Sequence, residues 1–170
     1  KQEEENYDVP LVPLRDLYNI EYGSKNEKIT DEFNSYPSIS GGSKVSKYTN
    51  QWNIPENTIL IARSGSCGSV NMFQTKCLMG SYGFFLKIKE QININNKYVY
   101  QYLKFNQYNV EKLARGTTVK NINREKLYDF KIPVPSLEVQ TQIVEELTQI
   151  EESVNAIEER ISQLEREKEQ

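Results

Sequence analysis

The sequence predicts an α+β protein: a globular domain with a twisted, mostly antiparallel β-sheet and a packed helix, followed by a long C-terminal coiled-coil helix. Three observations support this prediction. Short apolar runs bounded by turn residues recur between residues 36 and 89, residues 95–116 have helical spacing, and apolar residues near the C-terminus alternate at steps of four and three. Strands, an internal helix and a terminal helix are typical of α+β domains.

The first elements follow an extended entry. Leu14, Leu17 and Ile20 share one side and fit a short helix or turn. Gly23 ends this element, and residues 36–43 are typical of a strand end that runs into a glycine-rich turn.

Three strands are predicted next. Residues 58–62 form a buried strand, residues 63–69 a glycine-rich loop, and residues 70–74 a second strand. Residues 84–89 alternate and indicate a half-buried strand, with Phe84, Leu86 and Ile88 on the buried face and Phe85, Lys87 and Lys89 on the other.

A helix and a basic segment complete the globular part. Asn95 or Asn96 can cap a helix whose apolar residues recur at helical spacing until Gly116. Residues 115–127 are predicted to form a loop. A last extended piece then carries Leu127, Phe130, Ile132 and Val134.

The terminal helix has a clear start. Pro133 and Pro135 do not fit a helix interior, Ser136 can accept from the first free amides, and Glu138 complements the helix dipole. From residue 136 to 170 the helix would be about 50 Å long. Its apolar seam consists of Ile143, Leu147, Ile150, Val154, Ile157, Ile161 and Leu164.

This seam predicts a coiled coil, because it keeps a strict two-in-seven pattern beyond three heptads. The alternative is an amphipathic helix that lies on its own domain. Such a helix needs a third apolar position, and the flanking positions here hold charged side chains instead: Glu151, Glu158, Arg160 and Glu165. A second helix is therefore expected as the partner.

The chain divides into three expected segments: residues 1–8 as the tail of a preceding helix or a linker, 9–135 as the globular domain, and 136–170 as a spacer and dimerisation helix. The first residue is Lys1, and the opening residues resemble the charged closing ones. This indicates a piece of a longer chain, with a processed start or an expression artefact as the alternative.

Composition narrows the function. No run of 18 apolar residues and no signal-peptide pattern occurs, so we expect a soluble, cytoplasmic protein. There is no histidine, and the cysteines Cys67 and Cys77 are expected to be reduced thiols. Two cysteines cannot close a tetrahedral metal site without distant carboxylates, so neither metal nor cofactor is expected.

Charge is distributed unevenly along the chain. Residues 33–131 contain 14 Lys and Arg against 5 Asp and Glu, a net charge of +9, whereas residues 132–170 contain 3 against 10, a net charge of −7. A basic domain is the expected footprint of a polyanion partner. The alternative is that lysine is simply the common surface residue of this composition.

Side chains suited to phosphate and base contacts lie in the glycine-rich loops and the basic segment. The alternatives are that Arg63 pairs with a surface carboxylate and that Tyr82 is an ordinary turn residue. The candidate DNA-binding residues are Ser40, Lys44, Lys47, Arg63, Ser64, Ser66, Tyr82, Arg115, Thr117, Thr118, Lys120 and Asn123.

Four segments in order resemble the specificity subunits of Type I restriction-modification enzymes, in particular one target recognition domain with its following conserved helix. They are Val12-Pro-Leu-Arg-Asp-Leu with the later Gly23, residues 55–68, residues 116–127, and Ile132-Pro-Val-Pro-Ser-Leu-Glu-Val-Gln with the helix after it. The last segment is the most specific.

The resemblance implies sequence-specific binding of double-stranded DNA, one half of a split target being read by each of two such domains. It also implies two long antiparallel helices as a spacer, and as partners adenine methyltransferase subunits, a restriction subunit, and a second copy or second half of the specificity subunit. This chain has one domain and one helix, so it fits a half subunit, a fragment, or the recognition tail of a fused methyltransferase-nuclease.

Catalysis by this chain is not expected. The sequence has no Asn/Asp-Pro-Pro-Tyr/Phe methyltransferase motif, no Gly-Lys-Ser/Thr phosphate loop and no convincing nuclease cluster. The other remaining class is a coiled-coil assembly module whose basic face is incidental.

Overall fold

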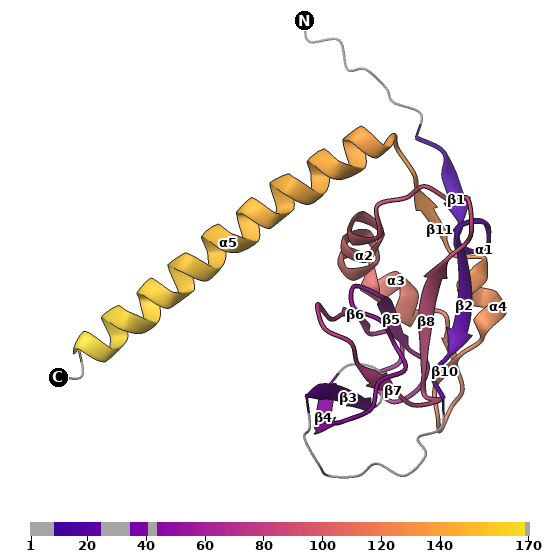
Figure 1. Ribbon diagram of the computed structural model, residues 1–170, viewed down its shortest axis with the longest axis horizontal. Helices are drawn as coiled ribbons and strands as arrows, with labels where there is room; N and C mark the ends of the chain where they lie inside the picture. Colours follow the sequence, from indigo (N-terminus) through magenta and orange to yellow (C-terminus); the bar gives the residue numbers. More distant parts are fainter. Residues whose placement is uncertain (1–8, 25–34, 41–43, 169–170) are drawn as a thin grey trace, which may run out of the picture.

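The computed structural model describes residues 9–24, 35–40 and 44–168, and it shows the predicted α+β fold with a long C-terminal helix (Figure 1). The main sheet has four antiparallel strands in the order β2-β8-β5-β6. Their bounds are β2 Tyr18–Tyr22, β8 Gly83–Ile88, β5 Ile59–Ala62 and β6 Val70–Met72.

A second, smaller sheet has the order β4-β3-β7, with bounds β3 Tyr36–Ser40, β4 Lys44–Thr49 and β7 Leu78–Met79. β3 pairs antiparallel with β4 and parallel with β7. Between the sheets lies a second apolar cluster that includes Leu60, Cys77 and Phe85. β5 is therefore buried on both faces, as its unbroken apolar sequence predicted.

The second cluster covers one side chain of β8 that was expected to be exposed. Phe84 and Leu86 are buried in the main core, as expected. Phe85 is not on an exposed face, because it packs against the second cluster. Lys87 is exposed, whereas the ammonium of Lys89 donates to the carbonyl of Arg15.

The two ends of the globular part meet. β1, Leu11–Pro13, pairs antiparallel with β11, Lys131–Pro133, and the amide of Val134 donates to the carbonyl of Pro10. Between β1 and β2 lies a single helical turn, α1, Leu14–Leu17. The long helix leaves the domain beside this β1–β11 pair, at the end opposite β3 and β4 (Figure 1).

The internal helix is shorter than expected. α2 spans Asn96–Phe105, and the side chain of Asn95 accepts from two amides of its first turn, as predicted. The helix does not run on to Gly116, because Asn106 leaves the helical conformation and a separate α3 follows at Gln107–Glu111. This break lets Val110 reach the core, where it is fully buried.

The basic segment is not a plain loop. β9, Ala114–Arg115, and β10, Asn121–Ile122, form a small antiparallel ladder. Gly116 adopts φ +125 in the turn between them, a conformation that other residues rarely adopt. α4 follows at Arg124–Tyr128, so Leu127 is a buried helical residue rather than part of the last extended piece.

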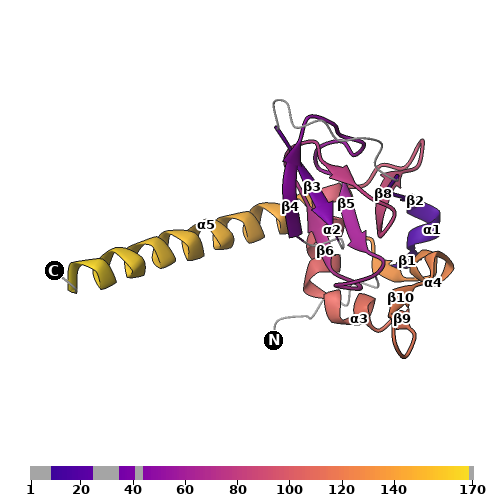
Figure 2. The same cartoon turned by 90° about the horizontal axis from the view of Figure 1, so that it is seen from below.

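The C-terminal helix α5, Leu137–Lys168, begins as predicted, and the hydroxyl of Ser136 accepts from the amide of Val139 at 3.3 Å. Its first turns contact α2, with Ile143 and Val144 half-buried against the main core. Beyond them α5 projects away from the domain (Figure 2). No helix in the described ranges is long and apolar enough to cross a membrane.

Candidate nucleic-acid interface

A cluster of one tyrosine and two arginines lies where the main sheet meets α4. The guanidinium carbon of Arg63 is 5.3 Å from the ring centre of Tyr22, and that of Arg124 is 5.0 Å from it. Both distances are within cation–π range. Within the described residues, neither guanidinium has a carboxylate or a hydrogen-bond partner. We call these three residues the Tyr22 cluster.

Arg63 is held by its backbone. It directly follows the buried strand β5, its amide donates to the carbonyl of Tyr82 at 2.9 Å, and its carbonyl accepts from the amide of Ile122 at 3.0 Å. These two bonds join the 63–69 loop to the turn before β8 and to β10. Residues far apart in the sequence are thus brought to one surface.

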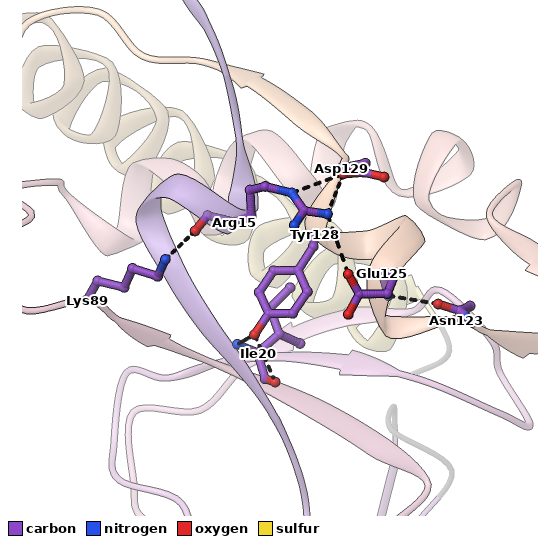
Figure 3. Close-up of polar contacts among 7 residues, drawn as sticks. All are labelled: Arg15, Ile20, Lys89, Asn123, Glu125, Tyr128 and Asp129. Atoms are coloured by element: carbon purple, nitrogen blue, oxygen red, sulfur yellow. Dashed lines mark hydrogen bonds and ion pairs between the residues drawn. The ribbon is translucent and has the colours of Figure 1, made fainter.

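Arg124 is the first residue of α4, and Figure 3 shows the contacts that anchor this helix. Asn123 caps this helix, its side-chain oxygen accepting from the amide of Glu125 at 2.8 Å. The hydroxyl of Tyr128 accepts from the amide of Ile20 at 2.9 Å, only two residues before Tyr22. α4 and β2 are therefore tied together next to the Tyr22 cluster.

An ion pair supports the same junction. The guanidinium of Arg15 donates twice to Asp129, lies 3.5 Å from Glu125, and stacks over the ring of Tyr128 (Figure 3). The hydrogen bond to Asp129 raises the pKa of Arg15. The three charged side chains are exposed, so the ion pair contributes little stability by itself, but it places Arg15 over the Tyr128 ring.

Close backbone packing joins the neighbouring turns. A Cβ added to Gly23 would lie 2.2 Å from the carbonyl oxygen of Gly80, and the amide of Gly23 donates to the carbonyl of Gly83. Only glycine allows this approach. The end of β2, just after Tyr22, is consequently fixed against the turn that carries Tyr82.

Several predicted residues do come together around the cluster. Tyr82 is 65% exposed, and Ser66 lies exposed in the same loop as Arg63. Lys120 is near enough to Cys67 for its charge to affect that thiol. Apart from this group, the exposed candidates of the basic segment lie on the β9–β10 hairpin: Arg115 in β9, and Thr117 and Thr118 in the turn.

Other candidates differ in their surroundings. Ser64 is buried, 9% exposed, and Asn123 uses its side-chain oxygen to cap α4. Lys44 and Lys47 are exposed on β4, an edge strand of the smaller sheet. Ser40 pairs with Lys44 across β3 and β4, and its side chain lies outside the described part.

The smaller sheet carries an aromatic and basic surface of its own. The ammonium of Lys76 lies 4.2 Å from the ring centre of Trp52, which is 44% exposed. Tyr48 is also exposed, on the same strand as Lys44 and Lys47. Aromatic rings interleaved with lysines suit contact with a nucleic-acid backbone and its bases.

Sequence reasoning did not select Tyr22 and Arg124. Arg124 belongs to the basic segment, and its place as the first residue after the Asn123 cap could have marked it as a fixed side chain. No local signal singled out Tyr22, because its role depends on two arginines from other elements.

Burial favours the neutral form of both thiols. Burial raises the pKa of the Cys77 thiol to about 11. Burial also raises the pKa of Cys67, although a hydrogen bond from the Ile122 backbone and the charge of Lys120 act in the opposite direction. Across the described ranges, no three metal-binding side chains lie together.

A second surface lies along α5. The seam residues beyond the domain are exposed, from 40% at Leu164 to 60% at Ile157. At its start, the seam borders an apolar groove between α2 and α5, lined by Tyr98, Gln101, Tyr102, Phe105, Ile143 and Leu147. Gln101 is 6% exposed and its side-chain oxygen lacks a partner among the described residues. The free seam and this groove together are an uncovered helix-packing surface.

The globular domain thus carries exposed basic and aromatic side chains, and the helix that projects from it has an exposed apolar seam. The family model described as Type I restriction modification DNA specificity domain matches residues 4–166. The chain belongs to this family.

Individual relatives support the same family assignment. A protein named as a type I specificity subunit in Mycoplasma pneumoniae is 34% identical over 136 residues, which cover 79% of this chain and 36% of that protein. The type I restriction enzyme EcoDI specificity subunit of Escherichia coli is 26% identical over 142 residues, 82% of this chain and 30% of that subunit.

The similarity of the fold to a solved structure supports the same assignment. The crystal structure of the Type-I restriction-modification S subunit from M. genitalium matches with a TM-score of 0.77 and 28% identity, over 90% of this chain and 42% of that one. The chain thus spans about a third of the length of the curated relatives and less than half of the solved one.

Proposed function

We propose that this chain recognises one half of a bipartite double-stranded DNA target for a Type I restriction-modification enzyme, or for a fused enzyme of related design. The observation that carries the proposal is the Tyr22 cluster, in which two arginines without described partners are fixed on one exposed tyrosine. Family membership supports it, because the family is that of a DNA specificity domain.

Affinity and specificity would come from different side chains. Exposed lysines, among them Lys44, Lys47 and Lys120, are suited to phosphates, which set affinity and its salt dependence. Arg63, Tyr82 and Arg124 surround the fixed loops and are suited to base edges. A good bidentate base contact discriminates by about 1–3 kcal/mol, so a few such contacts suffice for a half-site.

We propose that residues 9–135 recognise the DNA and that residues 136–170 form the spacer helix. A second long helix would cover the seam of α5, supplied by a second copy of the chain or by the second half of a longer subunit. Apolar residues near one end of this second helix would also enter the groove bordered by Phe105. A hydrogen-bond donor on the second helix would pair with the side-chain oxygen of Gln101. Adenine methyltransferase and restriction subunits are the further proposed partners.

The DNA proposal is tested by selection from a random duplex pool at two salt concentrations. We expect enrichment of a short motif, and we expect Lys120→Ala to weaken binding to all sequences and to reduce the slope of log affinity against log salt by about one. Lys131→Ala is the matched control, because Lys131 is exposed on β11, at the other end of the domain (Figure 1).

Absence of binding at low salt would contradict DNA recognition and leave the assembly module. The same conclusion would follow if Lys44→Glu and Lys120→Glu preserved function in the assembled enzyme. Salt-sensitive binding without enrichment would show phosphate contacts only and would contradict sequence-specific recognition by this chain.

Helix pairing is tested by sedimentation of the chain and of Ile157→Asp. We expect self-association or association with a separately supplied helix to be lost, because Ile157 is in the seam and 60% exposed. Asn155→Asp adds the same charge outside the seam and should leave association unchanged. Equal behaviour of the two variants would contradict a seam interface.

A further inference from the structure

The geometry of the Tyr22 cluster points to a particular ligand within the DNA. An arginine on a flexible surface can follow a phosphate, but Arg63 and Arg124 are half-buried and share one aromatic ring. Stacking on a ring restricts the orientation of a guanidinium plane and leaves its N–H edge available. The fork of N–H groups at this edge matches two acceptor atoms that lie in one plane at fixed positions.

We propose that Arg63 and Arg124 each read a guanine through its N7 and O6 atoms in the major groove. This rests on the proposed function. Arginine to guanine O6 and N7 is the commonest specific side-chain contact to DNA, and both atoms are acceptors that lie in the base plane. Phosphates have another set of candidates in the exposed lysines, so the two arginines are not required for charge alone.

The cluster also sets the spacing of the two guanines. Both guanidinium carbons lie within about 5 Å of the same ring centre, so they are at most about 10 Å apart. Successive base pairs rise by about 3.4 Å. With the two forks approaching the groove side by side, we expect the two guanines, on the same or on opposite strands, within about three base-pair steps of each other in the half-site.

The residues that hold the Tyr22 cluster in place make it suitable for discriminating between bases. Tyr22 rests on Phe84 at 5.1 Å between ring centres, and Phe84 is fully buried in β8. Arg63 follows the buried strand β5, and Arg124 is fixed through the bond between Tyr128 and Ile20. A guanidinium held over a ring on these anchored elements has less freedom to follow a different base, so a wrong base leaves its N–H groups unpaired.

The test uses the motif selected by the intact chain. We expect two guanines within three steps, and replacement of either by 7-deazaguanine, which removes only the N7 acceptor, should weaken binding at least fivefold. Arg63→Lys should abolish the preference at one guanine and Arg124→Lys at the other, with an unchanged salt slope, because lysine keeps the charge and loses the fork.

The matched control is Arg160→Lys. Arg160 is an exposed arginine on α5, outside the globular domain, whose guanidinium donates to the side-chain oxygen of Gln163. We expect this variant to bind all sequences with the same preferences as the parent chain.

The outcomes separate this inference from the proposed function. A selected motif without two nearby guanines, or a motif insensitive to 7-deazaguanine, overturns the guanine inference and leaves DNA recognition intact. Arg63→Lys and Arg124→Lys variants that keep both base preferences show phosphate contacts instead. A chain with no sequence preference overturns both proposals.

Discussion

The hydroxyl of Tyr128 substitutes for a missing strand at the edge of the main sheet. β2 is an edge strand, and Ile20, at its centre, is 1% exposed. The Tyr128 hydroxyl accepts from the amide of Ile20 at 2.9 Å and lies 3.5 Å from its carbonyl oxygen (Figure 3). Tyr128→Phe keeps the ring under Arg15 and removes this polar partner.

The expected cost is that of leaving a buried amide unpaired, about 1–3 kcal/mol in the free energy of unfolding. For a chain of this size that lowers the melting temperature by roughly 2–10 °C. Urea unfolding followed by far-UV circular dichroism measures the change. Tyr108→Phe is the matched control, since Tyr108 is 68% exposed and should change the stability by less than about 0.5 kcal/mol.

The reasoning would be refuted if Tyr128→Phe were as stable as Tyr108→Phe. A second readout follows from the position of the bond, two residues before Tyr22. We expect Tyr128→Phe to weaken base preference at the guanine read by Arg124 more than at the one read by Arg63, since α4 carries Arg124.

Three further predictions concern stability. Gln140→Leu should cost about 2 kcal/mol or more in urea unfolding, because the buried Gln140 side chain bonds the Asn95 amide and the Pro135 carbonyl; no cost would contradict this. Gly23→Ala should cost about 3 kcal/mol in the same assay, and Gly80→Ala, whose Cβ has 4.0 Å of clearance, should cost almost nothing. The raised pKa of Cys77 favours the neutral thiol in the fold, so its stabilisation is complete below pH 9 and is lost between pH 9 and about 11. Cys77→Ala should lack this part of the pH dependence; an identical pH profile would refute it.

Local patterns were sufficient for the elements whose causes are local. The continuous apolar run at residues 59–62 gave a doubly buried strand, Asn95 capped α2, and Ser136 began α5 after two prolines. The membership of a DNA specificity family was also visible in four short segments, and it was confirmed. Capping, proline sterics and periodic burial act within a few residues, so the sequence displays them directly.

Other features arose from competing long-range packing. The helical spacing through Val110 and Leu113 concealed the break at Asn106, which turns the chain so that Val110 can be fully buried. Phe85 alternates with core residues and was expected outside, but the smaller sheet covers that face of β8. Neither the break nor the second sheet is encoded in the spacing of the residues concerned.

By itself, the sequence determined the α+β class, the basic domain, the acidic helix with its seven-residue seam, and the segments that carry the family resemblance. The tertiary structure alone brought Tyr22, Arg63 and Arg124 together. That meeting depends on a bond between Ile20 and Tyr128, which are 108 residues apart in the chain, and on backbone bonds from Arg63 to Tyr82 and Ile122. Contacts over such separations are set by how sheets and helices pack, and local side-chain patterns do not specify them.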